Sequence, residues 1–357
     1  MRNVNNHIHT IYSFSPYTPR EAVLRAKEAG LATVGLMDHD SVAGADEFLA
    51  AARDYGIGAT IGFECRVSLA GTQFADKRVN NPDQRGVAYL AMHGIPYKHL
   101  CIAEGFLKPI RGKRLERNRK MVEKLNKNLK PGMPSISWED VLKCSQYHNG
   151  GTVTERHILY SFAAAITEDE PARHFLLGMF KAQLMDSFYI DADDELPHIS
   201  DFINLAEEIG AIPAYAYLGD VTNSVTGDKK AQEFEDGYLD ELFAYLKSVG
   251  FSAVTYMPAR NTLRQLARVM GLCERHGIFQ ISGEDINSPF QSFVCEKIET
   301  PEFCHLIDSA WALIGHEKMS ELGLEYGMFS EKTKIEMPDL KQRIKFYAEK
   351  GKEYYEK

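Results

Sequence analysis

Asn6-His7-Ile8-His9-Thr10 places two histidines two residues apart in a short segment near the amino terminus. Side chains two apart on a β-strand point to the same face, so His7 and His9 would present both imidazoles on one side. Two neutral imidazoles on a rigid strand suit a divalent transition metal such as zinc, manganese or iron. Because the chain has 12 histidines, one such pair is a weak signal by itself, and the hypothesis depends on the surrounding sequence.

Short apolar strands alternate with amphipathic helices after this segment. A helix is predicted from Pro19, a first-turn proline preceded by Thr18 as the N-cap residue. Residues 31–37 and 58–63 are predicted to form buried strands, separated by a helix over residues 43–55. Alternation of this kind favours a largely parallel sheet with crossover helices, which is an α/β fold.

The predicted strands end in residues that can bind metals or anions. The carboxyl ends of parallel strands meet at one mouth of a barrel, where such enzymes keep their active sites. Asp and Asn after a strand also begin loops or cap helices, which explains single cases but not the whole set. The strand-end residues are His7, His9, Asp38, His39, Asp40, Glu64, His93, Asp220, Arg260, Glu284, Asp285 and Asn287.

Length and composition predict a globular protein with a large core. With 357 residues, 44% hydrophobic and 25% charged, the chain fits one barrel-sized domain plus an insertion. No apolar run approaches a membrane span, and the first residues lack the apolar core of a signal peptide. We therefore expect a cytoplasmic protein with no membrane partner. The six cysteines form no Cys-x-x-Cys pair, so free thiols are expected.

Charge is unevenly distributed along the chain. The net charge of −9 disfavours a protein that coats nucleic acid, yet residues 108–130 are strongly basic. In that segment a basic stripe recurs at helical spacing, which indicates a solvated helix face. Alternatively, its near end, with Arg114 and Arg117, leans over the barrel mouth and binds substrate phosphate. The stripe consists of Lys113, Arg117, Lys120, Lys124 and Lys127.

Together these motifs resemble the polymerase and histidinol phosphatase (PHP) family, over about residues 1–95 and 200–295. The resemblance implies a distorted (β/α)7 barrel, in a family where many members are metal-dependent phosphoesterases. It also implies that His7, His9, Glu64 and Asp285 hold the first metal ion. The motifs that carry the resemblance are His7-x-His9-Thr10, Tyr12-Ser13, Asp38-His39-Asp40, Gly62-Phe63-Glu64 and Ser282-Gly283-Glu284-Asp285.

The sequence departs from the family where other metal ligands are usual. Ala88 stands at a usual histidine, and His93 could replace it as a ligand only if the loop bends back. Tyr217 and Asn287 occupy two further histidine positions, where they could hydrogen-bond a substrate oxygen. Ser13 or Ser15 stands where a further Asp or His is typical. We therefore expect one or two divalent ions (Zn, Mn or Fe) per chain.

Other candidate residues come from strand ends and from a helical insertion. His39 would hold a second metal or act as general acid, with Asp38 or Asp40 setting its tautomer. Thr154-Glu155-Arg156-His157 opens an apolar helical run, with threonine as N-cap. Several PHP phosphoesterases have an Arg or Thr just before a His at this point, so Arg156 and His157 are candidate substrate residues. Arg260 is a candidate anion contact, and a surface arginine is the alternative.

The predicted organisation is a PHP barrel over residues 1–98 and 199–300, a helical insertion over residues 99–198, and C-terminal helices over residues 301–357 packed on the barrel. The predicted function is a metal-dependent hydrolase, namely a phosphoesterase that uses metal-activated water on a small phosphorylated metabolite. Two alternatives stay open. One is a catalytically impaired PHP domain that binds a metabolite or partner, and the other is a metallohydrolase of C–N bonds.

Overall fold

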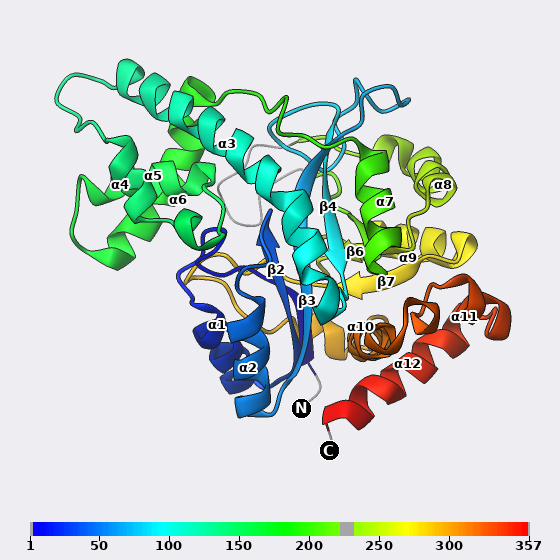
Figure 1. Cartoon of the computed structure of the whole chain (residues 1–357). Coiled ribbons are helices and arrows are strands. Elements are labelled where there is room, and N and C mark those ends of the chain that lie inside the picture. The colour runs from blue at the N-terminus through cyan, green and yellow to red at the C-terminus, as the bar shows by residue number, and fades with distance from the viewer. Residues whose placement is uncertain (1–2, 222–231, 356–357) are drawn as a thin grey trace.

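A computed structural model describes residues 3–221 and 232–355, and its centre is a seven-stranded sheet (Figure 1). The strands are β1 (Asn3–Ile8), β2 (Leu31–His39), β3 (Gly58–Ser68), β4 (Val87–His93), β5 (Ile212–Ala216), β6 (Ala253–Tyr256) and β7 (Phe279–Ser282). They lie side by side in sequence order, and Ile8 at the end of β1 bridges to Ile286 just after β7. The sheet therefore nearly closes on itself, which confirms the predicted distorted seven-stranded barrel.

The strand β4 runs antiparallel to both of its neighbours, whereas the other neighbouring strands are parallel. Ala91 lies opposite Glu64, and His93 pairs with Ile212 at the start of β5. His93 therefore lies deeper in the barrel than Glu64, and the prediction that it reaches the mouth is wrong. The reason is the connection: residues 69–86 form a loop without a crossover helix, so β4 returns alongside β3 as in a hairpin.

Helices α1 (Pro19–Glu28) and α2 (Ala45–Tyr55) cover the outer face of the first strands. Thr18 and Glu21 form the reciprocal capping box that begins α1, as the sequence predicted. Gly56 ends α2 with a φ of 60°, a left-handed conformation that glycine adopts without steric cost. Local sequence therefore fixes both helix ends, and their apolar faces pack on the sheet.

Helices dominate the segment between β4 and β5. Its helices are α3 (Leu100–Asn128), α4 (Trp138–Lys143), α5 (Glu155–Ala164), α6 (Glu170–Phe188) and α7 (Ile199–Ile209). Helices α3 to α6 share an apolar cluster of their own, centred on side chains such as Met121, Ile158 and Phe162. In Figure 1 α4, α5 and α6 stand beside the barrel, and α3 runs from the barrel to them. The first half of α3 packs on the barrel in one cluster with α7, α8 (Leu239–Val249) and α9 (Leu263–His276).

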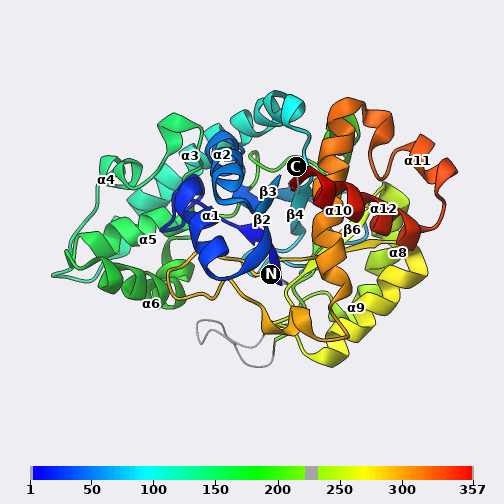
Figure 2. The same ribbon diagram turned by 90° about the horizontal axis from the view of Figure 1, so that it is seen from below.

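The C-terminal helices close the end of the barrel that lies away from the mouth. They are α10 (His305–Leu322), α11 (Glu331–Glu336) and α12 (Leu340–Tyr355), and α12 packs across α10 (Figure 2). Glu317 of α10 accepts hydrogen bonds from the Thr60 hydroxyl at 2.9 Å and from the Ile61 amide at 3.0 Å. These bonds tie α10 directly to β3.

Short 3-10 turns complete the structure at Tyr97–His99, Tyr147–Asn149, Asp236–Tyr238, Glu296–Glu299 and Leu324–Tyr326. Within residues 3–221 and 232–355, no helix combines the length and the apolar character that a membrane span requires.

Candidate metal centre and pocket

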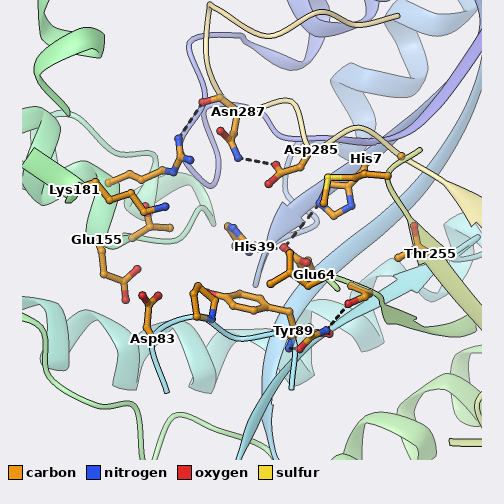
Figure 3. Close-up of a pocket in the computed structure, with 18 of the residues that line it drawn as sticks. His7, His39, Glu64, Asp83, Tyr89, Glu155, Lys181, Thr255, Asp285 and Asn287 are labelled. Carbon is orange, nitrogen blue, oxygen red and sulfur yellow. Dashed lines mark hydrogen bonds and ion pairs between the residues drawn. The ribbon is translucent and has the colours of Figure 1, made fainter. Parts of the chain in front are cut away.

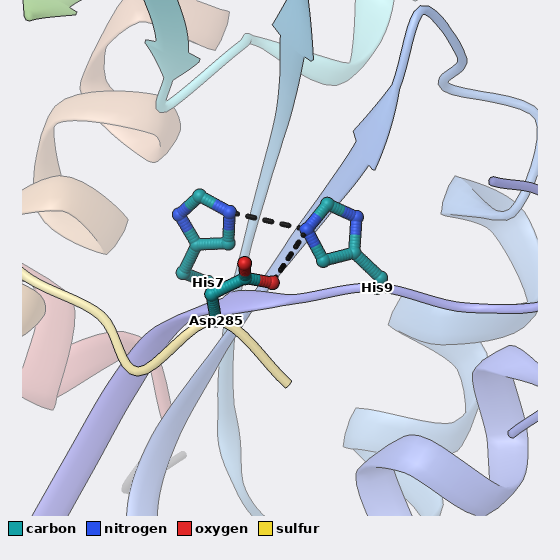
Figure 4. Close-up of side chains that lie close together, drawn as sticks. All are labelled: His7, His9 and Asp285. Atoms are coloured by element: carbon teal, nitrogen blue, oxygen red, sulfur yellow. Dashed lines mark hydrogen bonds and ion pairs between the residues drawn. The ribbon is translucent and has the colours of Figure 1, made fainter. Parts of the chain in front are cut away.

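His7 of β1 and His9, which directly follows β1, meet an aspartate from the other end of the sheet (Figure 4). His7 Nε2 lies 3.2 Å from His9 Nε2, which in turn lies 3.1 Å from Asp285 Oδ1. Main-chain hydrogen bonds set this approach, because Ile286 N donates to His7 O and His9 N donates to Ile286 O. The segment after β7 therefore pairs with β1 and brings Asp285 to the histidines.

A second group forms where β2 and β3 end. The parallel register places His39 beside Glu64, and His39 Nδ1 lies 3.1 Å from Glu64 Oε2. The rings of His9 and His39 are 4.6 Å apart between centroids. The ligand atoms of His7, His9 and Asp285 all lie within 4.8 Å of one another, and those of His9, His39 and Glu64 do the same. His9 is common to both groups.

These separations fit a divalent cation. Ligand atoms about 2.1 Å from one ion lie roughly 3.0 to 3.4 Å from each other at tetrahedral or octahedral angles. Three of the observed separations are 3.1 to 3.2 Å, whereas His7 Nε2 and Glu64 Oε2 are 3.8 Å apart. His39 Nδ1 is buried, and although Glu64 Oε2 lies 3.1 Å away the two do not form a well-aligned hydrogen bond. The predicted ligands His7, His9, Glu64 and Asp285 are thus drawn together, with His39 among them.

The loop after β1 fixes the tautomer of His9. Asp38 accepts hydrogen bonds of 2.6 Å from the Thr10 amide, the Thr10 hydroxyl and the Ser13 hydroxyl. Because Ser13 gives its only hydrogen to Asp38, its oxygen accepts from His9 Nδ1–H at 3.1 Å. The lone pair of His9 Nε2 is then directed at the cluster. Asp38 therefore orients His9 and does not set the tautomer of His39 as predicted.

Asp40 does not set that tautomer either. Its carboxylate accepts a hydrogen bond from Arg114 at 2.7 Å, and its carbonyl oxygen accepts one from Arg111 at 2.9 Å. Its amide donates to the main-chain oxygen of Glu64 at 2.8 Å. The ring nitrogen Nδ1 of His39 faces Glu64, so the predicted aspartate partner for His39 is replaced by a glutamate.

Burial sets the protonation of the cluster. It raises the pKa of Glu64 to about 8, lowers the pKa of His7 to about 4, and lowers the pKa of His39 well below its usual value. Burial also opposes ionisation of Asp285, but the hydrogen bond from His9 holds the pKa of that carboxyl well below its usual range. His7 and His39 are thus neutral, whereas at His9 burial is outweighed by the hydrogen bond and the charge of Asp285, which raise the pKa of His9 overall. A bound cation would replace the proton on His9 Nε2 and stabilise the deprotonated forms of His9 and Glu64.

A pocket opens above the cluster, between the barrel and the helical insertion (Figure 3). His7, Glu64 and Thr255 come from the barrel side, whereas Glu155 and Lys181 come from the insertion. The lining residues that carry charge or a hydrogen-bonding group include His7, His39, Glu64, Asn80, Asp83, Tyr89, Arg114, Thr154, Glu155, Arg156, Lys181, Tyr217, Thr255, Asp285 and Asn287.

Four of the predicted substrate residues line this pocket. Arg114 and Arg156 come from α3 and α5, and Arg156 Nη1 donates to Asn287 O at 3.5 Å. The Asn287 side-chain amide donates to Asp285 Oδ1 at 2.6 Å, so this residue steadies a candidate ligand. The Tyr217 hydroxyl donates to Asp236 at 2.6 Å, away from the metal cluster.

Three other predictions are corrected by the structure. Arg117 is 6% exposed and pairs with Glu155 and Glu195, so it belongs neither to a solvated stripe nor to the pocket wall. His157 caps α5, because its Nδ1 accepts a hydrogen bond from the Thr154 amide at 2.9 Å. Arg260 lies outside the pocket wall, where its Nε donates to Leu218 O at 3.1 Å.

His93 is a fourth correction. It lies outside both ligand groups, and neither of its ring nitrogens has a hydrogen-bond partner within the described part of the chain. Burial lowers its pKa to about 3, so the imidazole is neutral. Its position follows from the antiparallel direction of β4, which carries Tyr89 to the pocket and His93 into the barrel interior.

Several pocket residues lie outside the set predicted from the sequence. Lys181 lies on α6 and Asp83 in the loop between β3 and β4, and neither stands in a motif. Tyr89 could have been found from strand alternation, because it shares a face with Ala91, the residue opposite Glu64. For Lys181 no sequence signal was available, since a lysine on an amphipathic helix is normally solvated.

A nearly closed barrel thus carries histidines and carboxyl groups at one mouth, an arrangement that can hold a divalent cation. Residues 5–130 match the family model described as the PHP domain. Among curated proteins, none matches the chain.

Two solved structures resemble the whole fold. A protein from Bifidobacterium adolescentis, described as a candidate metal-dependent phosphoesterase, has a TM-score of 0.60 at 22% identity, covering 82% of this chain and 93% of that one. An amidohydrolase from Chromobacterium violaceum, solved with bound sulfate and no metal, has a TM-score of 0.61 at 20% identity, covering 82% and 90%. At these identities the likeness establishes the fold.

Proposed function

We propose that this protein is a metal-dependent phosphoesterase that acts on a small phosphorylated molecule. The observation that carries the proposal is the pairing of a buried histidine and carboxylate cluster with basic side chains in one pocket. Arg156 and Lys181 bring positive charge to the pocket wall contributed by the insertion, in a protein whose net charge is −9. These two cations attract an anionic substrate, although the pocket lining also includes the acidic residues Asp83 and Glu155.

In this proposal the cluster holds one or two divalent ions of zinc, manganese or iron. His7, His9 and Asp285 would hold one ion, and His39 and Glu64 would hold a second with His9 between the two groups. A divalent ion in such a site supplies Lewis acidity, because it lowers the pKa of water and polarises a phosphoryl oxygen.

The protein side chains would then bind and orient the ester. Arg156 is tethered to the loop that carries Asp285 through its hydrogen bond to Asn287 O, so its guanidinium is directed towards the cluster end of the pocket. A guanidinium there pairs with phosphate oxygens in a bidentate manner. Burial keeps His39 neutral, and the neutral form suits a metal ligand better than a general acid, so we assign His39 to metal binding.

Hydrolysis of a C–N bond is the second candidate function. It draws support from the fold shared with the protein named as an amidohydrolase, since the same metal chemistry cleaves either bond. Arg156 and Lys181 favour the phosphate ester, because an amide group carries no charge that these two side chains would bind. A metal-binding protein that turns over no substrate is the third outcome that an experiment must separate.

Elemental analysis combined with two substrate panels tests the proposal. Purified protein loaded with Mn²⁺, Zn²⁺ or Fe²⁺ would be assayed on phosphate esters and, separately, on amides and cyclic C–N substrates. We expect turnover of phosphate esters only. Turnover restricted to C–N substrates would establish the second candidate, and bound metal without turnover in either panel would establish a binding protein.

Variants test the pocket wall. Arg156→Ala should lower kcat/KM on the best ester. The ratio to wild type should correspond to about 1.5 to 3 kcal/mol of lost transition-state stabilisation, the loss expected for a charged hydrogen bond, and metal content should stay intact. Arg119→Ala is a matched control, because Arg119 is exposed on α3. If kcat/KM of Arg156→Ala stays within about twofold of wild type, this arginine does not bind substrate.

A further inference from the structure

A buried network of ion pairs extends inward from the pocket lining, which Arg114 and Glu155 reach. Three arginines and three carboxylates alternate in it, and each of the six residues is at most 9% exposed. The positive and negative charges balance, which is required for charges removed from water. The members are Arg66 of β3, Arg114 and Arg117 of α3, Asp40 after β2, Glu155 at the start of α5, and Glu195 before α7.

Arg114 connects the candidate metal centre to the insertion side of the pocket through two ion pairs. Its Nη1 donates to Asp40 Oδ2 at 2.7 Å, and its Nη2 donates to Glu155 Oε2 at 2.7 Å. Asp40 directly follows His39 in the chain, and Glu155 directly precedes Arg156. The Arg114 guanidinium thus holds Asp40, the neighbour of the candidate metal ligand His39. It also holds Glu155, the neighbour of the candidate phosphate ligand Arg156.

The backbone at Asp40 shows why this contact bears on His39. Asp40 has a φ of 50°, in the left-handed region that residues other than glycine seldom occupy. Such a conformation persists only where the surroundings hold it. Here the carboxylate is held by Arg114, the carbonyl by Arg111 and the amide by Glu64 O. The direction in which His39 leaves the strand depends on this turn.

We propose that Arg114 is a positioning residue that orients His39 through Asp40 and Arg156 through Glu155, and so couples metal binding to binding of the substrate anion. The inference rests on the proposed function, because it takes His39 as a metal ligand and Arg156 as a phosphate ligand. Coupling of this kind is reciprocal: if metal raises the affinity for phosphate by a given factor, phosphate raises the affinity for metal by the same factor.

Arg117 supplies a matched control one turn further along α3. It is buried like Arg114 and also pairs with Glu155, but its second carboxylate is Glu195. Within the described part of the chain it forms no ion pair or hydrogen bond with Asp40. Arg117→Met therefore removes one buried charge from the same network on the same helix. It leaves the Asp40 turn intact, so a general loss of packing would affect both variants alike.

The experiment measures affinity in the full-length protein, independently of turnover. Metal-free wild type, Arg114→Met, Arg114→Lys and Arg117→Met would be titrated with Mn²⁺ by calorimetry, with and without inorganic phosphate. We expect Arg114→Met to weaken Mn²⁺ binding at least tenfold. It should also abolish the increase in Mn²⁺ affinity that phosphate produces in wild type. Arg117→Met should stay within about twofold of wild type for Mn²⁺ alone.

Arg114→Lys keeps the charge but cannot pair with two carboxylates in a fork, so it should bind Mn²⁺ with intermediate affinity. It also keeps the test decisive if Arg114→Met fails to fold. Mn²⁺ affinity of Arg114→Met or Arg114→Lys equal to wild type would overturn the positioning role, and so would an equal loss in Arg117→Met. In those cases the proposed phosphoesterase activity would still stand, whereas a wild type that binds none of Mn²⁺, Zn²⁺ and Fe²⁺ would overturn both.

Discussion

Replacing Glu195 with Gln should destabilise the protein strongly, because this carboxylate joins the insertion to the barrel. Glu195 is 3% exposed and pairs with Arg66 of β3 and with Arg117 of α3, the latter at 2.7 Å. The change keeps the side-chain volume and removes one negative charge from a network with three charges of each sign. It leaves two buried guanidinium groups facing a neutral amide.

The loss in the free energy of unfolding depends on the ion pairs and hydrogen bonds that Arg66 and Arg117 would keep. Removing one partner of a buried ion pair costs about 3 to 5 kcal/mol, since the remaining charge stays desolvated. Arg117 keeps Glu155 at 2.6 Å and Ile190 O at 2.7 Å, and Arg66 keeps Glu155 at 3.7 Å. We therefore expect a loss of about 3 kcal/mol, at the lower end of that range.

Urea unfolding followed by circular dichroism would measure this loss. Glu116→Gln is the control, because Glu116 is exposed on α3 and its replacement should change the free energy of unfolding by less than about 0.5 kcal/mol. The loss in Glu195→Gln should persist in high salt, since buried pairs are poorly screened. A free energy of unfolding for Glu195→Gln within about 0.5 kcal/mol of wild type would show that the Glu195 carboxylate does not stabilise the contact between the insertion and the barrel.

Three further changes test the metal centre and the helix packing. His9→Ala should remove most of the bound metal measured by elemental analysis, because His9 belongs to both ligand groups, whereas His148→Ala at an exposed site should retain it. Ser13→Ala should weaken metal affinity about 10- to 100-fold by freeing the His9 tautomer, and an unchanged dissociation constant would contradict the hydrogen-bond order assigned here. Gly315→Ala should destabilise the protein by about 1 to 3 kcal/mol in thermal unfolding, because a Cβ would lie 1.9 Å from a backbone oxygen of α12. Gly271→Ala, on a helix face with open space, should instead stabilise it by up to about 1 kcal/mol.

Much of the fold and of the candidate site could be predicted because the determinants are local. Thr18 and Pro19 set the start of α1 through their own backbone preferences. The two-residue spacing of His7 in β1 and His9 just after it predicted that both rings point to one side. In parallel strands, residues at the carboxyl ends meet without further information. The convergence of His39, Glu64 and Asp285 with these histidines was therefore predictable.

The direction of β4 could not be read in the same way. An apolar strand has the same pattern in either direction, and only the absence of a crossover helix over residues 69–86 makes the antiparallel return possible. That single reversal moved His93 into the interior and brought Tyr89 to the pocket.

The fate of the charged residues was decided only by the tertiary structure. The spacing of Arg117 on α3 predicted a solvated helix face, yet it is buried because Glu155 and Glu195 approach from segments 38 and 78 residues away in the sequence. A charge can leave water only where partners compensate for the lost hydration. The residue types and their spacing in the sequence were sufficient to identify the candidate metal ligands. Only long-range ion pairing decided which charged side chains face the pocket and which are buried in the network that supports the pocket.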